Sequence, residues 1–419
     1  MNRRRRAGGG KSWHPLALTA ALLMLPILGV CGGGPRASAP AAERPQVVKG
    51  LDDRVGWYRM PAGDTALVTY SAKGGLRLFS LWDTIYATTF VPGADGLLHA
   101  GGPDAPVVEF REWDGRVTGF EWPVGSGSYA ERLPGYGYQV EPFAVEVEGV
   151  TLAGSLFLPR DRPNPVPGAV IIHGSGASDR DNYWYMTFAD TLVRSGLAVM
   201  LPDKRGSGQS GGDWFTTGLA GFADDVAAQV QALREHSAVD PGRVGLVGMS
   251  QGGHIAPMVA PRVDPAFVVN ISGSAVPLNE QIVHELSQDM KRDQLPGILD
   301  AVVRPISVWV VKRRRPEWWA TNGPIDPIEH WAEVTAPAVT LYGRLDESDN
   351  VPVARSVERL DSLGLPNLDV WVFEGVGHGL MIPDPNRVRP DILERLAEWV
   401  ADAISADAVS GAADPGTEL

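Results

Sequence analysis

The chain has a single cysteine, Cys31, among its 419 residues. One cysteine cannot form an intramolecular disulfide, and its place beside an N-terminal apolar run leaves no thiol in the main body of the chain to act as a nucleophile. No second apolar run after residues 16–30 is long enough to cross a bilayer. Basic residues number 37 against 50 acidic ones, and the net charge of -13 argues against a general nucleic-acid binder. The single cysteine argues against a disulfide-based scaffold and a cysteine-dependent enzyme, and the excess of acidic residues argues against nucleic-acid partners.

The N-terminus has the layout of a secretory signal. Arginines at positions 3–6 and Lys11 precede the apolar run at 16–30. Residues 1–31 are therefore predicted to be a signal peptide, and the protein is predicted to be exported from the cytoplasm.

Two ways of processing this signal remain open. The tripeptide L-G-V before Cys31 resembles a bacterial lipobox, and lipidation of Cys31 would anchor the protein to a membrane. However, Val30 fits that motif poorly. Cleavage after A-S-A at 37–39 would release a secreted protein instead. In both cases the Gly- and Pro-rich residues 32–46 are predicted to be a flexible linker.

The length of the chain predicts two folded units, since single cores rarely grow past about 250 to 300 residues. Residues 47–138 are predicted to form an all-β module, and residues 139–405 a catalytic α/β domain. The long insertion at 274–331 is predicted to be a lid, because connections in α/β units usually take only about 2 to 6 residues. Residues 406–419 are predicted to be a disordered tail.

The N-terminal module contains short apolar runs separated by Gly, Pro and Asp, which is typical of antiparallel strands. Its residues 110–120 weakly resemble the small lipocalin-like β domains attached to some serine hydrolases. Its tryptophans are interpreted as core aromatics rather than a ligand platform, and no chemistry is assigned to the module. The predicted strands are 66–70, 76–79, 107–110 and 117–120, and the tryptophans are Trp57, Trp82, Trp113 and Trp122.

After residue 139 the sequence pattern alternates between buried strands and amphipathic helices, which predicts a doubly wound, mostly parallel sheet. The basic run at 312–315, inside the lid, is interpreted as a solvated helix end, with an anionic substrate or membrane surface as the alternative partner. Residues 222–236 and 391–404 are predicted to be helical. The predicted strands are 169–172, 197–201, 244–247, 267–269, 338–342 and 370–373.

Residues 248–252 read G-M-S-Q-G and match the pattern G-x-S-x-G. The buried strand 244–247 runs directly into this motif, and helix-compatible residues follow it. A sharp turn between strand and helix exposes the serine oxygen, and it needs glycines at 248 and 252 because side chains there would collide with neighbouring backbone. Gly248 and Gly252 therefore support Ser250 as the predicted nucleophile.

A serine nucleophile needs a base and a group that orients the base, in the chain order Ser, acid, His for this kind of turn. Three histidines lie beyond the helix that follows the nucleophile: His284, His330 and His378. The first two fall in the predicted lid. His378 lies in a G-V-G-H-G loop directly after the last long strand, so it is the predicted base. His254, four residues after the nucleophile, is predicted to be packed.

The orienting acid should follow the penultimate strand. The loop there contains two candidates, Asp346 and Asp349.

Acyl transfer also needs N–H donors for the developing oxyanion. The predicted donors are the backbone N–H of Gln251 and that of Ser175, in the H-G-S-G sequence that starts at His173. Gly176 is the reserve for the second donor.

Three segments together resemble the EstD-like carboxylesterases, a bacterial α/β-hydrolase group related to the serine aminopeptidases and dienelactone hydrolases. They are H-G-S-G-A-S-D-R-D at 173–181, D-K-R-G-S-G-Q-S-G-G at 203–212 and G-M-S-Q-G-G-H-I-A-P at 248–257. The resemblance covers about residues 140–404. It implies an α/β-hydrolase fold and ester hydrolysis through Ser250, Asp346 and His378.

The resemblance also bears on the acid and on the loop beneath the site. Relatives read G-x-x-D-x-x-V-P, and Asp346 has that spacing from Gly343. The loop here is two residues longer than the pattern, so Asp349 remains the alternative acid. By the same resemblance, Asp203 and Arg205 form a structural ion pair near the site.

The predicted activity is two-step hydrolysis of small-molecule carboxylic esters, with no metal or cofactor. A peptidase or aminopeptidase acting on small amides is the alternative within the same fold. A non-catalytic surface-binding protein is the alternative from another class, and the complete Ser, His and Asp set argues against it. No motif indicates the acyl or alcohol part of a substrate, or an oligomeric state.

Overall fold

The computed structural model describes residues 51–80, 86–93, 97–101, 105–163, 165–292, 297–383 and 387–410. The described residues all belong to one compact unit, which spans residues 42–419. The predicted signal peptide, Cys31 and the predicted linker 32–46 lie outside the described residues.

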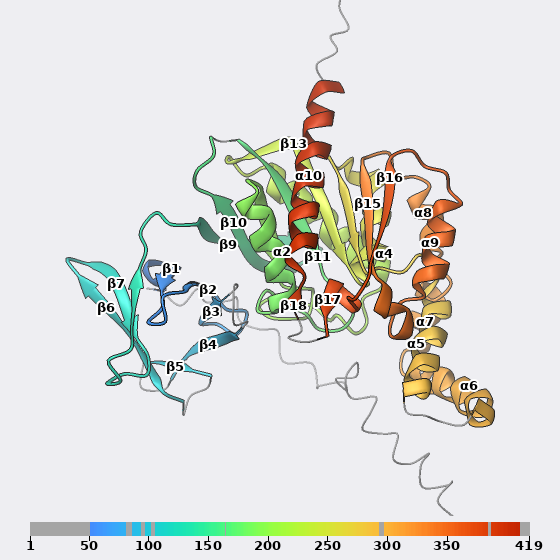
Figure 1. Ribbon diagram of the computed structural model, residues 1–419, viewed down its shortest axis with the longest axis horizontal. Coiled ribbons are helices and arrows are strands. Elements are labelled where there is room, and N and C mark those ends of the chain that lie inside the picture. Colours follow the sequence, from blue (N-terminus) through green and yellow to red (C-terminus); the bar gives the residue numbers. More distant parts are fainter. Residues whose placement is uncertain are drawn as a thin grey trace, which may run out of the picture. The chain divides into compact units, whose positions relative to one another are not determined.

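The N-terminal part is a closed barrel of short antiparallel strands, as predicted for a small β domain (Figure 1). Neighbours along the chain pair with one another, and the first strand closes the barrel against the last. A short 3-10 helix, η2 (Asp52–Arg54), precedes it. The strands are β1 (Gly56–Arg59), β2 (Thr65–Tyr70), β3 (Leu76–Ser80), β4 (Tyr86–Pro92), β5 (Leu98–Ala100), β6 (Val107–Trp113), β7 (Arg116–Glu121) and β8 (Tyr129–Arg132).

Aromatic side chains fill the interior of the barrel. Phe120 makes edge-on contacts with Tyr58 and Phe90, at ring-centroid distances of 5.0 and 5.7 Å. Of the tryptophans predicted to lie in the core, Trp57 is buried and Trp122 is partly buried against the barrel core, whereas Trp82 lies outside the described residues. Trp113 is 80% exposed, and for this residue the prediction was wrong. Trp113 stands at the end of β6, where Asp114 and the next glycine take positive φ angles in the hairpin turn, so it lies beyond the reach of the core.

The second part is built on a sheet with the order β16-β15-β14-β13-β11-β12-β10-β9. Strands β11 to β16 pair in parallel, whereas β10 pairs antiparallel with both β12 and the edge strand β9. This confirms the predicted doubly wound, mostly parallel sheet. The strands are β9 (Tyr138–Val147), β10 (Val150–Pro159), β11 (Val166–Ile172), β12 (Ala198–Pro202), β13 (Val239–Met249), β14 (Val268–Ile271), β15 (Ala338–Gly343) and β16 (Leu368–Phe373).

Alternate residues along the buried strands face two separate cores, because successive side chains of a strand point to opposite faces. Ile171 and Val247 pack with α2 (Tyr183–Arg194) and α10 (Pro390–Ser410). Val170 and Leu246 pack with the other face's helices, which are α3 (Leu219–Arg234), α4 (Gly252–Val263) and α9 (Val353–Asp361). Helix α10 continues five residues past the predicted domain end at 405, and the rest of the predicted tail lies outside the described residues.

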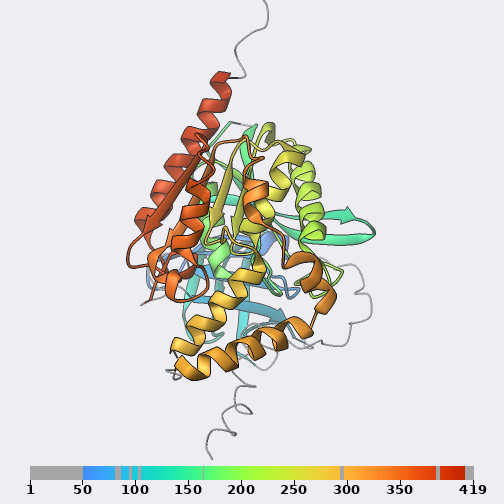
Figure 2. The ribbon, with the colours of Figure 1, turned by 90° about the vertical axis from the view of Figure 1, so that its right-hand side faces the viewer.

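The predicted lid is helical. It lies between β14 and β15, and α5 and α6 extend at the lower right of Figure 1 and at the bottom of Figure 2. None of the helices in the described part of the chain is both long and apolar enough to span a membrane. The lid helices are α5 (Leu278–Arg292), α6 (Gly297–Arg313), α7 (Pro316–Asn322) and α8 (Pro327–Trp331).

The barrel contacts the loop that follows β11. The carboxylate of Asp181 accepts hydrogen bonds from the Ser71 hydroxyl at 2.7 Å and from the Ala72 backbone N–H at 3.0 Å. Asp181 is buried, and it lies six residues after the predicted donor Ser175. The turn between β2 and β3 of the barrel therefore helps to fix the predicted oxyanion loop.

Candidate active site

Ser250 lies in the turn between β13 and α4 with a φ angle of 54°, a left-handed conformation that is rare for serine. Its backbone N–H donates to the Ile271 carbonyl at 2.8 Å, which ties the turn to β14. A Cβ at Gly248 would lie 2.3 Å from the Gly252 carbonyl oxygen, and one at Gly252 would lie 2.2 Å from the Ile172 carbonyl oxygen. The strained turn is thus possible only with glycine on both sides of the serine.

His378 begins the 3-10 turn η4 (His378–Leu380), which follows β16. Its Nδ1–H donates to Oδ2 of Asp346 at 2.8 Å, since an ionised carboxylate can only accept. Asp346 is fully buried in the 3-10 turn η3 (Arg344–Ser348) after β15, and its Oδ1 accepts the Asn350 backbone N–H at 3.2 Å. This arrangement orients the imidazole, and no hydrogen bond among the described residues involves Nε2.

Asp349, the alternative acid, has different partners. It forms an ion pair with Arg292 of the lid helix α5, and it accepts a hydrogen bond from the Asn350 side chain at 2.9 Å. Its side chain is 37% exposed, whereas that of Asp346 is fully buried. Of the two candidates, only Asp346 contacts the imidazole of His378 in the structure.

The loop after β14 connects the serine turn with the histidine turn. The Ser272 hydroxyl accepts the backbone N–H of Gly379, next to the histidine, at 3.0 Å. A Cβ on the adjacent Gly273 would lie only 2.8 Å from the Ser250 carbonyl oxygen. The Trp184 indole donates to the Gly379 carbonyl at 3.1 Å, and its ring lies 5.8 Å from that of His378. The loop after β14 therefore contacts both the turn that carries Ser250 and the turn that carries His378.

Two opposing effects act on the protonation of His378. Burial disfavours the imidazolium, but the charge of Asp346 and the hydrogen bond to it outweigh burial and raise the pKa of His378 above its usual value. Glu285, on α5, adds a smaller contribution in the same direction. The imidazole is thus tuned to be a stronger base than a free histidine.

The predicted oxyanion loop follows β11. Gly174 donates its backbone N–H to the Tyr185 hydroxyl at 2.9 Å, so this N–H is already occupied. Among the hydrogen bonds of the described residues, no protein acceptor takes the backbone N–H of Ser175 or of Gln251. The N–H groups of Ser175 and Gln251 thus differ from that of Gly174, which has an acceptor within the protein.

Lys204, directly after β12, connects these two donor segments. Its buried ammonium donates to the Gly174 carbonyl at 2.6 Å and to the Gln251 side-chain oxygen at 2.9 Å, and it lies 4.3 Å from the Phe222 ring centroid. Burial, reinforced by the charge of Arg315, lowers the pKa of Lys204 to about 7. A neutral amine still carries two N–H donors, so the connection persists on both sides of that pKa.

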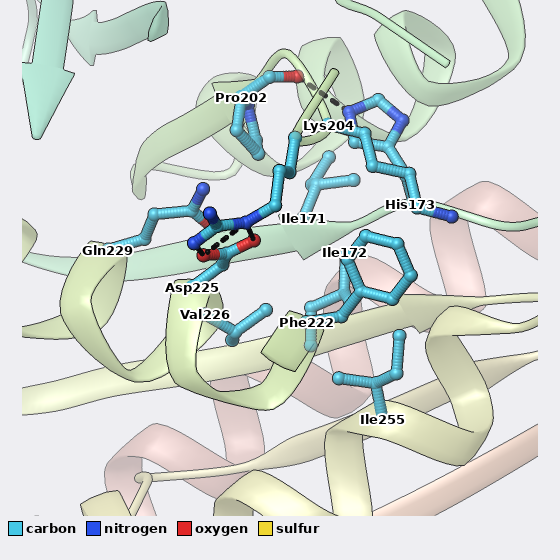
Figure 3. Close-up of a pocket in the computed structure, with 11 residues that line it drawn as sticks. Ile171, Ile172, His173, Pro202, Lys204, Phe222, Asp225, Val226, Gln229 and Ile255 are labelled. Atoms are coloured by element: carbon cyan, nitrogen blue, oxygen red, sulfur yellow. Dashed lines mark hydrogen bonds and ion pairs between the residues drawn. The ribbon is translucent and has the colours of Figure 1, made fainter. Parts of the chain in front are cut away.

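A cavity of about 30 Å³ lies beside Lys204 (Figure 3). Its volume is enough for about one or two water molecules. Because it is lined by neither Ser250, Asp346 nor His378, it is not a chamber for the reacting group of a substrate. The residues that line the cavity are Ile171, Ile172, His173, Pro202, Lys204, Arg205, Phe222, Asp225, Val226, Gln229 and Ile255.

Within the described ranges, no three His, Cys, Asp or Glu side chains cluster in a way that could hold a metal ion.

The lid contributes an acidic side chain near the histidine. Burial raises the pKa of Glu285 to about 7, although a hydrogen bond from Gln281 and the charge of His378 act in the opposite direction. The same Gln281 amide donates to Glu285 at 2.9 Å and to the Asn350 carbonyl at 3.4 Å. Helix α5 thus touches the loop that carries Asp346.

The predicted ion pair between Asp203 and Arg205 does not form, and that prediction was wrong. Asp203 is fully buried and pairs with Arg180, whose Nε and Nη2 reach the two carboxylate oxygens at 3.0 and 2.7 Å. Arg205 instead pairs with Asp225 of α3. The parallel strands β11 and β12 are neighbours, so the loop after β11 brings Arg180 to the carboxylate. Asp203 and Arg205 nevertheless each hold loops near the site together, Asp203 through Arg180 and Arg205 through Asp225.

The remaining histidines near the site are buried in the structure. His173 contacts the Ser178 hydroxyl at 3.0 Å and the Pro202 carbonyl at 2.6 Å, and His254 contacts the Ser274 hydroxyl at 3.1 Å. Burial lowers the pKa of both imidazoles to about 4. They are therefore neutral near pH 7 and serve as packed, hydrogen-bonded groups.

Sequence reasoning missed Lys204, Arg180 and Glu285. For Lys204 the sequence held a usable signal, because a lysine two residues after a buried strand lies at the carboxyl end of the sheet, where ligands bind. Arg180 lies within the quoted 173–181 segment but carried no partner in the sequence. Nothing in the sequence distinguishes Glu285 from the other acidic residues of a solvated helix.

Residues 169–391 match the alpha/beta hydrolase family, a span longer than half of the chain. The chain belongs to this family. This α/β hydrolase is similar to esterase EstD of Thermotoga maritima, with 24% identity over 322 residues that cover 68% of this chain and 74% of the esterase. It is also similar to the acylamino-acid-releasing enzyme of Sus scrofa, with 25% identity over 242 residues that cover 54% of this chain and 30% of that enzyme.

Among solved structures, an esterase of Pyrococcus furiosus has 22% identity and a TM-score of 0.48, and the match covers 63% of this α/β hydrolase and 91% of that chain. The family match and the esterase-named relative support a hydrolase function for the protein.

Proposed function

We propose that this α/β hydrolase is a serine carboxylesterase that uses Ser250, His378 and Asp346. The proposal is carried by the 2.8 Å hydrogen bond from His378 to the buried Asp346, together with the strained strand-to-helix turn that holds Ser250. A hydrolase that uses a serine nucleophile needs this combination, because the orienting acid holds the imidazole in the tautomer that can accept a proton.

The proposed reaction has two steps. Nε2 of His378 takes the proton of the Ser250 hydroxyl while its oxygen attacks the ester carbonyl, and the oxyanion accepts hydrogen bonds from the N–H groups of Gln251 and Ser175. The imidazolium then protonates the leaving alcohol, and the acyl group remains on the serine. In the second step His378 deprotonates a water molecule that attacks the acyl group. The imidazolium then returns this proton to the Ser250 oxygen as its bond to the acyl carbon breaks, and the carboxylic acid product leaves.

The choice between ester and amide hydrolysis is tested with acyl groups of equal shape. Alanyl and isobutyryl groups differ in one ammonium in place of a methyl group, and each is offered as a p-nitrophenyl ester and as a p-nitroanilide. We expect turnover of the isobutyryl ester, and no preference for the alanyl anilide over the isobutyryl anilide. An aminopeptidase would show the opposite preference, since it must recognise the ammonium. Hydrolysis of the alanyl anilide with a kcat/KM at or above that of the isobutyryl ester would overturn the esterase assignment.

Lys204 is expected to position the two oxyanion donors without contacting the substrate. The substitution Lys204→Met removes its hydrogen bonds to Gly174 and Gln251 while keeping a side chain of similar length beside Phe222. We expect kcat for the isobutyryl ester to fall roughly 10- to 100-fold with little change in KM, because small displacements of catalytic groups have effects of about this size.

The matched control is Lys291→Met, which changes an exposed lysine on α5 and should leave kcat within about twofold. Thermal unfolding of both variants checks that the fold is intact. A Lys204→Met protein that folds normally and keeps the wild-type kcat would contradict the positioning role.

A further inference from the structure

The lid helix α6 exposes a stripe of large apolar side chains. Val302, Ile306 and Trp309 are 59%, 55% and 57% exposed. Their spacing of four and three residues places them on one face of the helix, so they form a continuous stripe. Single exposed apolar residues are ordinary on a protein surface, but a stripe of this kind is typical of an interaction site.

The same helix ends in a basic segment. Residues 301–316 contain five Lys and Arg residues and no Asp or Glu, in a chain whose net charge is -13. The guanidinium of Arg313 lies 4.9 Å from the ring centroid of Trp309, so positive charge adjoins the apolar stripe directly. Arg313 and Arg314 are exposed. This surface is locally complementary to an anionic partner.

The other three basic residues of this segment have partners within the protein, and Arg304 donates to the Ser287 hydroxyl at 3.1 Å. Lys312 donates to the Asn279 side chain at 2.6 Å, and Arg315 donates to the Phe215 carbonyl at 2.9 Å and stacks on Trp318. The charge that remains for a partner therefore comes from Arg313 and Arg314. The interpretation of the whole run as a solvated helix end accounts for these two arginines, but not for the apolar stripe beside them.

Apolar side chains including tryptophan, with arginines beside them, are the composition of helices that lie in the plane of an anionic bilayer surface. We propose that α6 is an interfacial helix, whose face formed by Val302, Ile306, Trp309 and Arg313, together with Arg314 in the turn directly after it, docks this protein on an anionic lipid surface. The lipid takes up the apolar stripe, and its phosphate headgroups pair with the two arginines.

Docking through α6 has a consequence for the substrate. Helix α5, which packs against α6, contacts the loop of the proposed catalytic acid through Arg292 to Asp349 and through Gln281 to Asn350. The docked lid would thus hold the site close to the lipid, and the substrates are esters whose acyl chains partition into it. The inference about ester substrates rests on the proposed esterase function, whereas the docking of α6 on lipid does not.

Vesicle binding tests the docking independently of catalysis. The protein used is residues 42–419, which form a compact unit of their own and lack Cys31, so lipidation cannot contribute. Co-sedimentation is measured with vesicles of phosphatidylcholine mixed with phosphatidylglycerol, and with vesicles of phosphatidylcholine alone. We expect wild type and Ser250→Ala to bind the anionic vesicles equally, and both to bind the neutral vesicles more weakly.

Three variants locate the binding face. Replacing Val302, Ile306 and Trp309 together by serine should weaken binding to anionic vesicles at least about tenfold, because the buried apolar area is lost. The double variant Arg313→Gln/Arg314→Gln should weaken binding and reduce its dependence on salt. The matched control is Trp113→Ser, which removes an exposed tryptophan from the barrel and should leave vesicle binding unchanged.

Hydrolysis of soluble p-nitrophenyl isobutyrate by the same variants should equal that of wild type, which shows that their fold and site are intact. The proposal is overturned if wild type binds neither kind of vesicle, if the triple variant binds like wild type, or if Trp113→Ser is the variant that loses binding. It is also overturned if sedimentation velocity shows that the stripe holds two copies of the chain together instead. A protein that binds vesicles through α6 but hydrolyses no ester would overturn the esterase assignment alone.

Discussion

The substitution His378→Ala should lower kcat for a p-nitrophenyl ester by roughly 10⁴- to 10⁶-fold, the range found when the base of a serine hydrolase is removed. Without the imidazole, the Ser250 hydroxyl keeps its proton and is a weak nucleophile. The side chain also donates to the buried Asp346, so its loss leaves that carboxylate without its imidazole partner. Steady-state kinetics with p-nitrophenyl isobutyrate measures the effect, and circular dichroism verifies the fold.

The control for this result is His330→Ala. His330 lies on the lid helix α8 and also follows Ser250 in the chain, but it has no proposed role in the reaction. It should change kcat by no more than about twofold. If His330→Ala were as damaging as His378→Ala, or if His378→Ala kept more than about a hundredth of the wild-type kcat, the assignment of the base would be wrong.

The substitution Asp346→Asn should cost roughly 10³- to 10⁴-fold in kcat, because an amide no longer enforces the imidazole tautomer or stabilises the imidazolium. Asp349→Asn should cost at most a few-fold, since that carboxylate pairs with Arg292 on an exposed part of the lid. The comparison isolates the acid, because both substitutions remove one negative charge from the same loop. A larger loss for Asp349→Asn would transfer the role to that residue.

The pH dependence of kcat/KM is a second test of the pairing between His378 and Asp346. His378 acts as a base only when neutral, so kcat/KM should rise with pH as the imidazole loses its proton. Asp346 raises the pKa of His378, so the wild-type kcat/KM should rise at a higher pH than it would for a histidine without this partner. Asp346→Asn removes that stabilisation of the imidazolium, so the residual activity should rise at lower pH than in wild type. A rise that stays at the wild-type pH would contradict the coupling.

The elements that could be predicted from the sequence were those fixed by local patterning. Short apolar runs bounded by Gly, Pro or charge identified the parallel strands, including 244–247 within β13 and 338–342 within β15. Because functional groups of such sheets lie just beyond the carboxyl ends of the strands, the strand positions, together with the G-x-S-x-G motif and the chain order Ser, acid, His, brought Ser250, His378 and the two aspartates into consideration. The small β domain was identified in the same way, from turn residues between strand-length runs.

What could not be predicted depends on which segments meet in space. Asp203 and Arg205 lie two residues apart, yet the buried carboxylate pairs with Arg180 from a different loop. The choice between Asp346 and Asp349 was open in the sequence because the loop is longer than in the resembled family, and the structure places only one of them on the imidazole. Trp113 was predicted to be buried because it is aromatic, whereas its place at a hairpin tip leaves it exposed.

The central claim is that Ser250 is the nucleophile. A fluorophosphonate probe forms a covalent bond with an activated serine, and peptide mapping by mass spectrometry identifies the residue that carries it. The probe should label the wild-type protein on the peptide that contains Ser250, label Ser274→Ala at the same site, and leave Ser250→Ala unlabelled. Labelling that persists in Ser250→Ala, or that maps to another serine in the wild type, would contradict the claim.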